Sequence, residues 1–208
     1  MRGAKAKKLI PLWVFLGFLA AGGILYWYFF HAPLKVEREM SSPVVISEEE
    51  ACDFDEKIED LKEELERMEE GEIAALSITP SEASSKLSQA VGEFEELPED
   101  VEIGEVRINF KETEEGEVEV LGVARIAYKH KVLSAKIGFR VLVEPGEGAL
   151  ACTIEDVEIG NLPKSVQEKI KAFLPVGESK IIEFEGLPVK ILDLRVENGN
   201  LVLEVMRD

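Results

Sequence analysis

The chain begins with an unbroken apolar run and continues with amphipathic patterns. Residues 9–30 contain no charged side chain, and a helix needs about 20 apolar residues to cross a bilayer core. Basic residues precede the run, and the first acidic residue is Glu37. Because basic flanks stay in the cytoplasm, the pattern predicts a cytoplasmic tail at residues 1–8, a single transmembrane anchor at 9–30, and an extracytoplasmic remainder at the cell membrane.

A cleaved signal peptide is the competing interpretation of this run. Ala20, Ala21 and Gly22 form an acceptable cleavage site. Cleavage there would leave a mature chain that begins with the apolar segment GILYWYFF. We favour an uncleaved anchor, because nothing nearby would bury such an end.

Residues 31–71 predict a connector that carries an acidic helix. Prolines at positions 33 and 43 favour an exposed segment from 31 to 47. Residues 48–70 lack Gly and Pro, and their apolar residues recur at spacings of four and three, which is typical of a heptad seam. Two interpretations remain open, a coiled coil and a helix that lays one stripe on the domain. The seam residues are Phe54, Ile58, Leu61, Leu65 and Met68.

Beyond residue 98 the apolar period changes to two, which indicates strands. In the segment 149–159 the apolar phase shifts near Glu155, and this shift predicts a β-bulge. Asn198 and Gly199 form a strong signal for a two-residue hairpin turn. The expected strands are 101–110, 117–128, 132–144, 149–159, 179–185, 189–197 and 200–206, after a short extended stretch at 72–78.

Two amphipathic helices accompany these strands. Thr79, Pro80 and Glu82 form a helix start with a capping box, and this helix is expected to run to about residue 91. The second helix opens at 161–163 and carries an apolar stripe of Leu162, Val166, Ile170, Phe173 and Leu174. Short turns between successive strands imply an antiparallel meander. Residues 72–208 are therefore predicted to form an α+β domain, a curved antiparallel meander sheet packed with two amphipathic helices.

The charge of the chain limits the classes of partner that it can bind. All 42 acidic residues follow residue 32, against 20 of the 24 basic residues, which gives this part a net charge of −22. Nucleic-acid binding requires neutralised phosphates, so the charge argues against DNA or RNA as a partner. It also argues against electrostatic adhesion to anionic lipid surfaces.

Motifs for catalysis or for cofactors are missing from the sequence. His31 and His130 have no second His or Cys cluster at zinc-ligand spacing, and there is no P-loop, G-x-G-x-x-G or G-x-S-x-G motif. The serines near Lys86 fail the S-x-x-K spacing, because residue 83 is Ala. We therefore predict a non-enzyme with no cofactor and no metal site.

The two cysteines allow two interpretations. Cys52 and Cys152 both lie in the predicted extracytoplasmic part, where a disulfide between them is possible. Cys152 also sits in an alternating strand pattern in which a small buried hydrophobic residue fits equally well.

The order of these features resembles a known family. The helix ITPSEASSKLSQAV, the meander, and the segment ACTIEDVEIGNLPKSVQEKIKAFLP resemble YpmS-like membrane-anchored extracytoplasmic proteins, which are similar to the LmeA-like phospholipid-binding proteins. Both resemble the tubular lipid-binding (TULIP) superfamily, which includes the bactericidal/permeability-increasing proteins. The most telling match is 154–174. Lys164 departs from the pattern by replacing a second proline, and the 48–70 helix has no counterpart in it.

The resemblance implies a curved sheet around a long helix, with an apolar groove for acyl chains. A strand of twelve residues spans about 40 Å, which is the scale of a lipid tail. The expected function is binding of a lipid or other amphiphile in that groove. The alternative is an envelope scaffolding domain that assembles with itself or a partner through the 48–70 helix. The expected groove residues are Ile108, Phe110, Leu133, Ile137, Phe139 and Val141.

Overall fold

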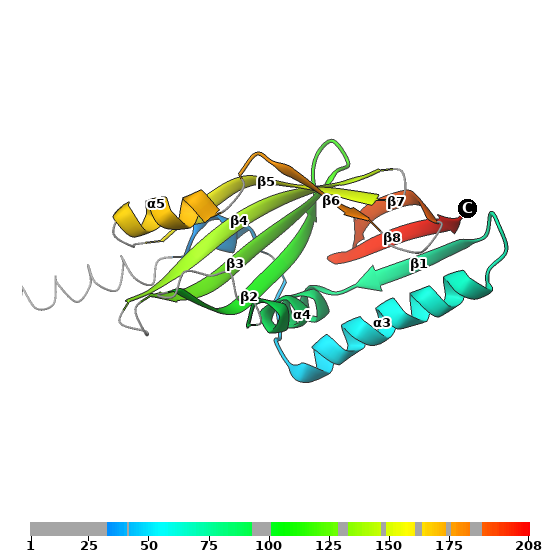
Figure 1. Cartoon of the computed structure of the whole chain (residues 1–208), viewed down its shortest axis with the longest axis horizontal. Helices are drawn as coiled ribbons and strands as arrows, with labels where there is room; N and C mark the ends of the chain where they lie inside the picture. The colour runs from blue at the N-terminus through cyan, green and yellow to red at the C-terminus, as the bar shows by residue number, and fades with distance from the viewer. Residues whose placement is uncertain are drawn as a thin grey trace, which may run out of the picture. The chain divides into compact units, whose positions relative to one another are not determined.

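A five-stranded antiparallel meander is the larger of the two sheets in the computed structural model (Figure 1). The structure describes residues 33–40, 42–92, 101–128, 133–146, 149–160, 164–173, 176–183 and 189–208. The meander has the strand order β2-β3-β4-β5-β6, as the alternating pattern and short turns predict. Its strands are β2 (Val101–Glu112), β3 (Val118–Tyr128), β4 (Leu133–Pro145), β5 (Ala149–Ile159) and β6 (Ser179–Glu183).

The remaining strands form a second sheet, where the sequence predicted a single one. Strand β1 (Ile73–Ile78) pairs with β8 (Asn200–Arg207), which also pairs with β7 (Val189–Glu197), all antiparallel. Asn198 and Gly199 both have positive φ, 52° and 84°, so the predicted hairpin turn is confirmed. Because β8 is paired on both sides, it has no free edge left to extend the meander.

The predicted helix starts are confirmed at α3 (Glu48–Arg67) and α4 (Pro80–Gly92). At α4 the Thr79 N–H donates to the Glu82 carboxylate at 2.9 Å, and the Glu82 N–H donates to Thr79 Oγ1 at 3.2 Å. This is the reciprocal capping box. The heptad seam of α3 packs on the domain itself, since Leu61 and Leu65 are buried in the main core and Phe54, Ile58 and Met68 pack against it.

One apolar cluster joins α3, both sheets and α4. We call the face of the meander that points into this cluster the inner face, and the opposite face the outer face. Strand alternation places Ile108 and Phe110 on the inner face and Arg107 on the outer face. The predicted bulge is confirmed in β5, because Arg140 pairs with Asp156 and Val141 with Ile154, which leaves Glu155 unpaired.

The segment expected as an exposed connector instead packs on the outer face. Leu34 and Val36 are buried in a small cluster with Leu121 and Val123 of β3. A short helix, α2 (Lys35–Glu39), lies within this segment. This packing removes the apolar area of Leu34 and Val36 from water, together with that of Leu121 and Val123 beneath them.

Two predictions fall outside what the structure describes. Helix α5 (Lys164–Phe173) forms where expected, but the side chains of its predicted apolar stripe lie outside the described residues. Among the described helices, none has the length and apolar character needed to cross a membrane. The predicted span at residues 9–30 lies outside the described part of the chain.

Candidate functional site

The strand register brings the predicted groove residues onto one face of the meander. Phe110, Val120, Val141 and Ile154 are successive cross-strand partners, and so are Ile108, Gly122, Phe139 and Val157. Ile137 belongs to the next row. Directly opposed residues on neighbouring strands lie on the same face, so these rows form one continuous apolar surface.

The predicted residues differ in how deeply they are buried. Ile108, Phe110 and Ile137 are buried, whereas Phe139 and Val141 are half-buried and pack against the core from its edge. Leu133 pairs with Tyr128 at the start of β4, and its side chain lies outside the described residues. The inner face is therefore closed on the β2 side and stays partly open around Phe139 and Val141 of β4.

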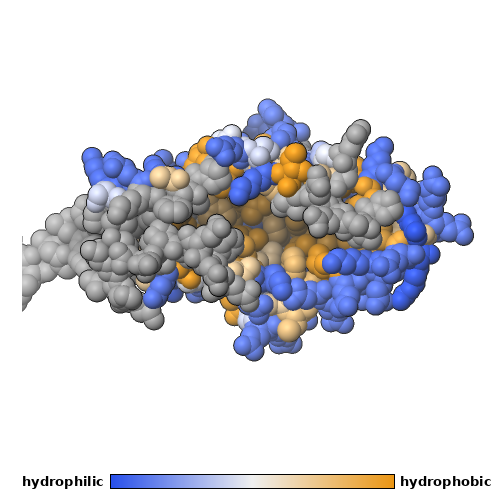
Figure 2. Space-filling view, viewed as in Figure 1, coloured by the Kyte–Doolittle hydropathy of each residue, from blue (hydrophilic) through white to orange (hydrophobic). Residues whose placement is uncertain are grey.

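Further half-buried apolar side chains extend this open part. The sequence reasoning missed Val120 on β3 and Leu150 and Ile154 on β5, all of which line the same face. Their signal is present in the alternation, but alternation assigns a face and does not show which positions are covered. Figure 2 shows apolar side chains gathered in a recess near the middle of the view.

Gly122 makes room for an aromatic ring on this face. A Cβ atom built at Gly122 would lie only 2.0 Å from the Phe139 ring, its cross-strand partner. No side chain fits at that distance, so the glycine makes room for the far end of the ring beside β3. The sequence alone shows a glycine in a strand. Such a glycine indicates that another group lies close to the backbone, but it does not identify Phe139 as that group.

Both cysteines are free thiols, so the possible disulfide does not form in the structure. Cys52 is exposed on α3, whereas Cys152 is half-buried on β5 and packs against the main core. Burial raises the pKa of the Cys152 thiol. Cys152 thus occupies the position of a small, partly buried hydrophobic residue on the inner face.

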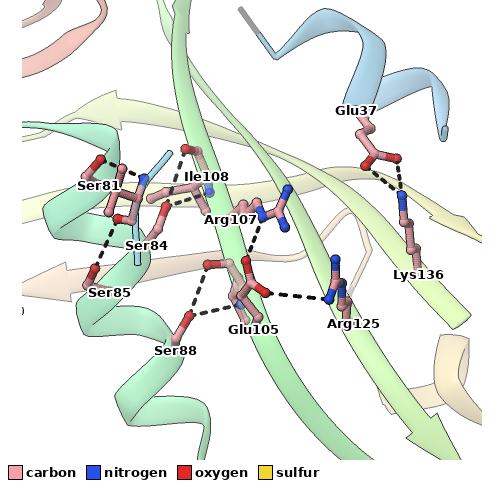
Figure 3. Close-up of polar contacts among 12 residues, drawn as sticks. Glu37, Ser81, Ser84, Ser85, Ser88, Glu105, Arg107, Ile108, Arg125 and Lys136 are labelled. Atoms are coloured by element: carbon pink, nitrogen blue, oxygen red, sulfur yellow. Dashed lines mark hydrogen bonds and ion pairs between the residues drawn. The ribbon is translucent and has the colours of Figure 1, made fainter. Parts of the chain in front are cut away.

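The serines of α4 close the free edge of the meander (Figure 3). Ser84 Oγ accepts the Ile108 N–H at 2.8 Å, and Ser88 Oγ accepts the Val106 N–H at 2.9 Å. Ser88 Oγ also donates to the Val106 carbonyl at 3.1 Å. These contacts satisfy backbone groups of an edge strand that would otherwise be unpaired. Their sequence signal is the four-residue spacing of two serines on one helix face.

Ion pairs fasten the α2 segment to the outer face. Lys136 Nζ donates to both carboxylate oxygens of Glu37, at 2.6 and 2.7 Å. Arg140 Nη2 donates to both oxygens of Glu39 at 3.1 Å, and Arg140 Nη1 donates to the buried Glu119. The hydrogen bond from Arg140 holds the pKa of Glu39 below its ordinary value, and the bond to Glu119 raises the pKa of Arg140.

No protein family, curated protein or solved structure matches this chain. The structure itself shows an α+β fold with mostly antiparallel sheets. Among the described residues, no group of three His, Cys, Asp or Glu side chains is arranged to hold a metal ion. The inner face combines buried and partly exposed apolar side chains.

Proposed function

We propose that this chain is a membrane-anchored extracytoplasmic protein that binds a lipid or other amphiphile on the inner face of its meander sheet. The observation that supports this most is the row Phe110, Val120, Val141 and Ile154. All four residues are apolar and lie on neighbouring strands of the sheet. Val120, Val141 and Ile154 are nevertheless only half-buried. An acyl chain in the recess would cover them.

Burial of methylene groups would supply the affinity. Each buried CH₂ contributes about 0.8 kcal/mol, so a few methylenes outweigh any single polar contact. The side chains that line the recess are aliphatic or aromatic, which favours chains over charged ligands. The resemblance of residues 154–174 to the YpmS-like and LmeA-like proteins, and through them to the TULIP superfamily, points to the same class of ligand.

The proposed anchor at residues 9–30 would restrict the ligand to membrane-derived amphiphiles. The net charge of −22 after residue 32 keeps the domain soluble and disfavours binding to an anionic bilayer through charge. Contact with lipid would therefore be apolar and local, through the recess rather than through the surface.

The alternative, assembly through the 48–70 helix, has less support. Leu61 and Leu65 of the heptad seam are 7% and 3% exposed in the protein's own core, so the seam is occupied. Assembly through α3 would have to use its acidic outer side. Deleting the helix would remove core residues, so it would not separate the two functions. A charge reversal on the exposed side of α3, at Glu56 and Glu59, separates them without touching the core.

Photo-crosslinking tests the lipid proposal on the full chain. We would reconstitute the protein in vesicles that contain a phospholipid with a diazirine near the end of one acyl chain, and map the crosslinked peptides. Crosslinks in β4 and β5 are expected, in addition to those in residues 9–30. Val141→Trp would fill the recess and should reduce the β4 and β5 crosslinks severalfold, whereas Leu192→Trp, at an exposed apolar position on β7, should leave them unchanged.

The two cysteines provide an internal second measurement. A lipid in the recess should slow maleimide alkylation of Cys152 and leave that of the exposed Cys52 unchanged in the same molecule. If crosslinks are confined to residues 9–30 and the lipid does not alter the Cys152 rate, the inner face is not a lipid site. Loss of self-association in the α3 charge-reversal variant would then favour the scaffolding alternative.

A further inference from the structure

The outer face of the meander carries a second candidate site, independent of the proposed lipid site. We propose that the pocket beside Arg107 and Arg125 binds a phosphate group, either as free phosphate or as part of a lipid headgroup. The pocket has a volume of about 190 Å³ and lies between the segment 37–44 and strands β2–β4. Val123 contributes an apolar floor.

A bulge in β2 brings the charged groups together. Ile103 pairs with Ile126 and Val106 with Ala124, so Gly104 and Glu105 together oppose the single residue Arg125. Bulges re-aim side chains in this way. Glu105 Oε1 accepts a bond from Arg107 Nε at 2.7 Å, and Glu105 Oε2 lies 3.7 Å from Arg125 Nη1. Figure 3 shows Glu105 between the two arginines.

The two guanidinium groups retain donors for a ligand. Arg125 forms no hydrogen bond with the described residues, and its nearest partner is the 3.7 Å ion pair with Glu105. Arg107 is held through Nε only, which leaves its terminal nitrogens free of described partners. A guanidinium group has five N–H donors in a planar fork that matches the oxygens of an anion. One carboxylate between two arginines uses a small part of this capacity.

The local charge also favours an anion. The pocket is lined by Arg107, Arg125 and Lys136 against Glu37 and Glu105, a formal net charge of +1 in a chain whose net charge is −18. The same face already holds two carboxylates from the chain's own α2, Glu37 on Lys136 and Glu39 on Arg140. The cations of this surface are therefore placed to bind oxygen anions.

Phosphate fits better than a further carboxylate. Glu105 already offers one oxygen to each arginine, so a second group with two oxygens would repeat that contact. A phosphate group has more acceptor oxygens than a carboxylate, and as a monoester it carries a charge between about −1.5 and −2, so it can accept from both forks while Glu105 remains in place.

Isothermal titration calorimetry on the full chain in a phosphate-free maltoside detergent tests this proposal. We expect saturable binding of inorganic phosphate, weakened about tenfold or more by Arg125→Gln, because bonds to charged groups are the strong ones. The matched control is Arg195→Gln on β7, an arginine whose three carboxylate partners lie within 2.7 Å. This variant should bind as the wild type does.

Glycerol 3-phosphate distinguishes the two sources. Tighter binding than inorganic phosphate assigns a lipid headgroup, and equal binding assigns free phosphate. Absence of saturable binding of both probes, or an Arg125→Gln variant with wild-type affinity, would overturn the proposal. Arg125 has a side chain that is 61% exposed, so its replacement should not impair folding. Crosslinking on the inner face is a separate readout, so failure of either proposal leaves the other standing.

Discussion

The two faces of the meander sheet are built from the same strands, yet they are covered in opposite ways. On the outer face, the α2 segment buries Leu121 and Val123 under Leu34 and Val36, and ion pairs fasten it at Lys136 and Arg140. On the inner face, Val120, Phe139, Val141 and Ile154 remain partly exposed although they are apolar. The protein thus covers part of the polar outer face with its own α2 segment and leaves part of the apolar inner face accessible.

This contrast indicates which parts of each face maintain the fold and which parts are free to bind. A half-exposed apolar face forfeits part of the free energy that its full burial would provide. The loss is offset elsewhere, by α3 in the core, by the serines at the β2 edge and by the outer-face contacts. We therefore expect substitutions at the covered positions of the outer face to affect stability, and substitutions at the partly exposed apolar positions of the inner face, such as Val141, to affect lipid binding more than stability.

The largest effect on stability is expected at Arg140. Arg140→Met removes the main partner of Glu119, whose side chain is 7% exposed, and leaves Lys111, at 3.9 Å, as its one ion-pair partner among the described residues. An uncompensated buried carboxylate costs about 3 kcal/mol, the lower end of the range for a broken buried pair, because Arg140 itself is partly exposed. Urea unfolding of the full chain, followed by circular dichroism, measures this loss.

A double variant checks the cause of that loss. Adding Glu119→Gln to Arg140→Met should recover part of the stability, since no buried charge is then left without a partner. If the double variant is less stable by the full sum of the single changes, the ion pair does not account for the effect.

A matched pair of valines compares the faces directly. Val123 is buried on the outer face and Val141 is half-buried on the inner face. Val123→Ala should cost about 2 kcal/mol and Val141→Ala about 1 kcal/mol, because the cost follows the apolar area and the cavity that truncation leaves. The unfolding free energies of both variants test this order. Equal costs would mean that the inner face is as closed as the outer face.

Local patterns in the sequence predict much of the larger sheet and of the helix starts. The phase shift in 149–159 predicts the unpaired Glu155, and Thr79 with Glu82 predicts the capping box, because both features depend on residues close in the chain. The predicted groove residues whose side chains are described share one face for the same reason. Strand alternation of period two determines the face on which each side chain lies.

Long-range pairing could not be predicted in this way. Lys136 and Glu37 are 99 residues apart, and the sequence around either residue contains no signal for their contact. The pairing of β1 with β8 and the ring of Phe139 over Gly122 also depend on tertiary contacts. The partly open region of the inner face is the clearest case, since alternation describes Ile108 and Val141 identically although only Ile108 is buried.

The smallest effect is expected from pH, and it concerns the outer face alone. The hydrogen bond from Arg140 lowers the pKa of Glu39 from 4.5, its ordinary value. A carboxyl group whose pKa is depressed by folding stabilises the protein above its unfolded pKa, and this stabilisation is lost as the pH falls through the folded pKa. The side chain of Glu39 is 38% exposed, so solvent screening limits the contribution to less than about 1 kcal/mol.

Glu39→Gln should therefore be less stable than the wild type at pH 7, with a difference that disappears as the pH falls below about 4.5. Unfolding free energies over this pH range provide the measurement. Glu144→Gln is the control, because Glu144 is an exposed carboxylate on β4, the strand that carries Arg140, and it forms no ion pair with a described residue. A Glu39→Gln difference that persists in acid would show that the shape of the Glu39 side chain, rather than its charge, accounts for its contribution.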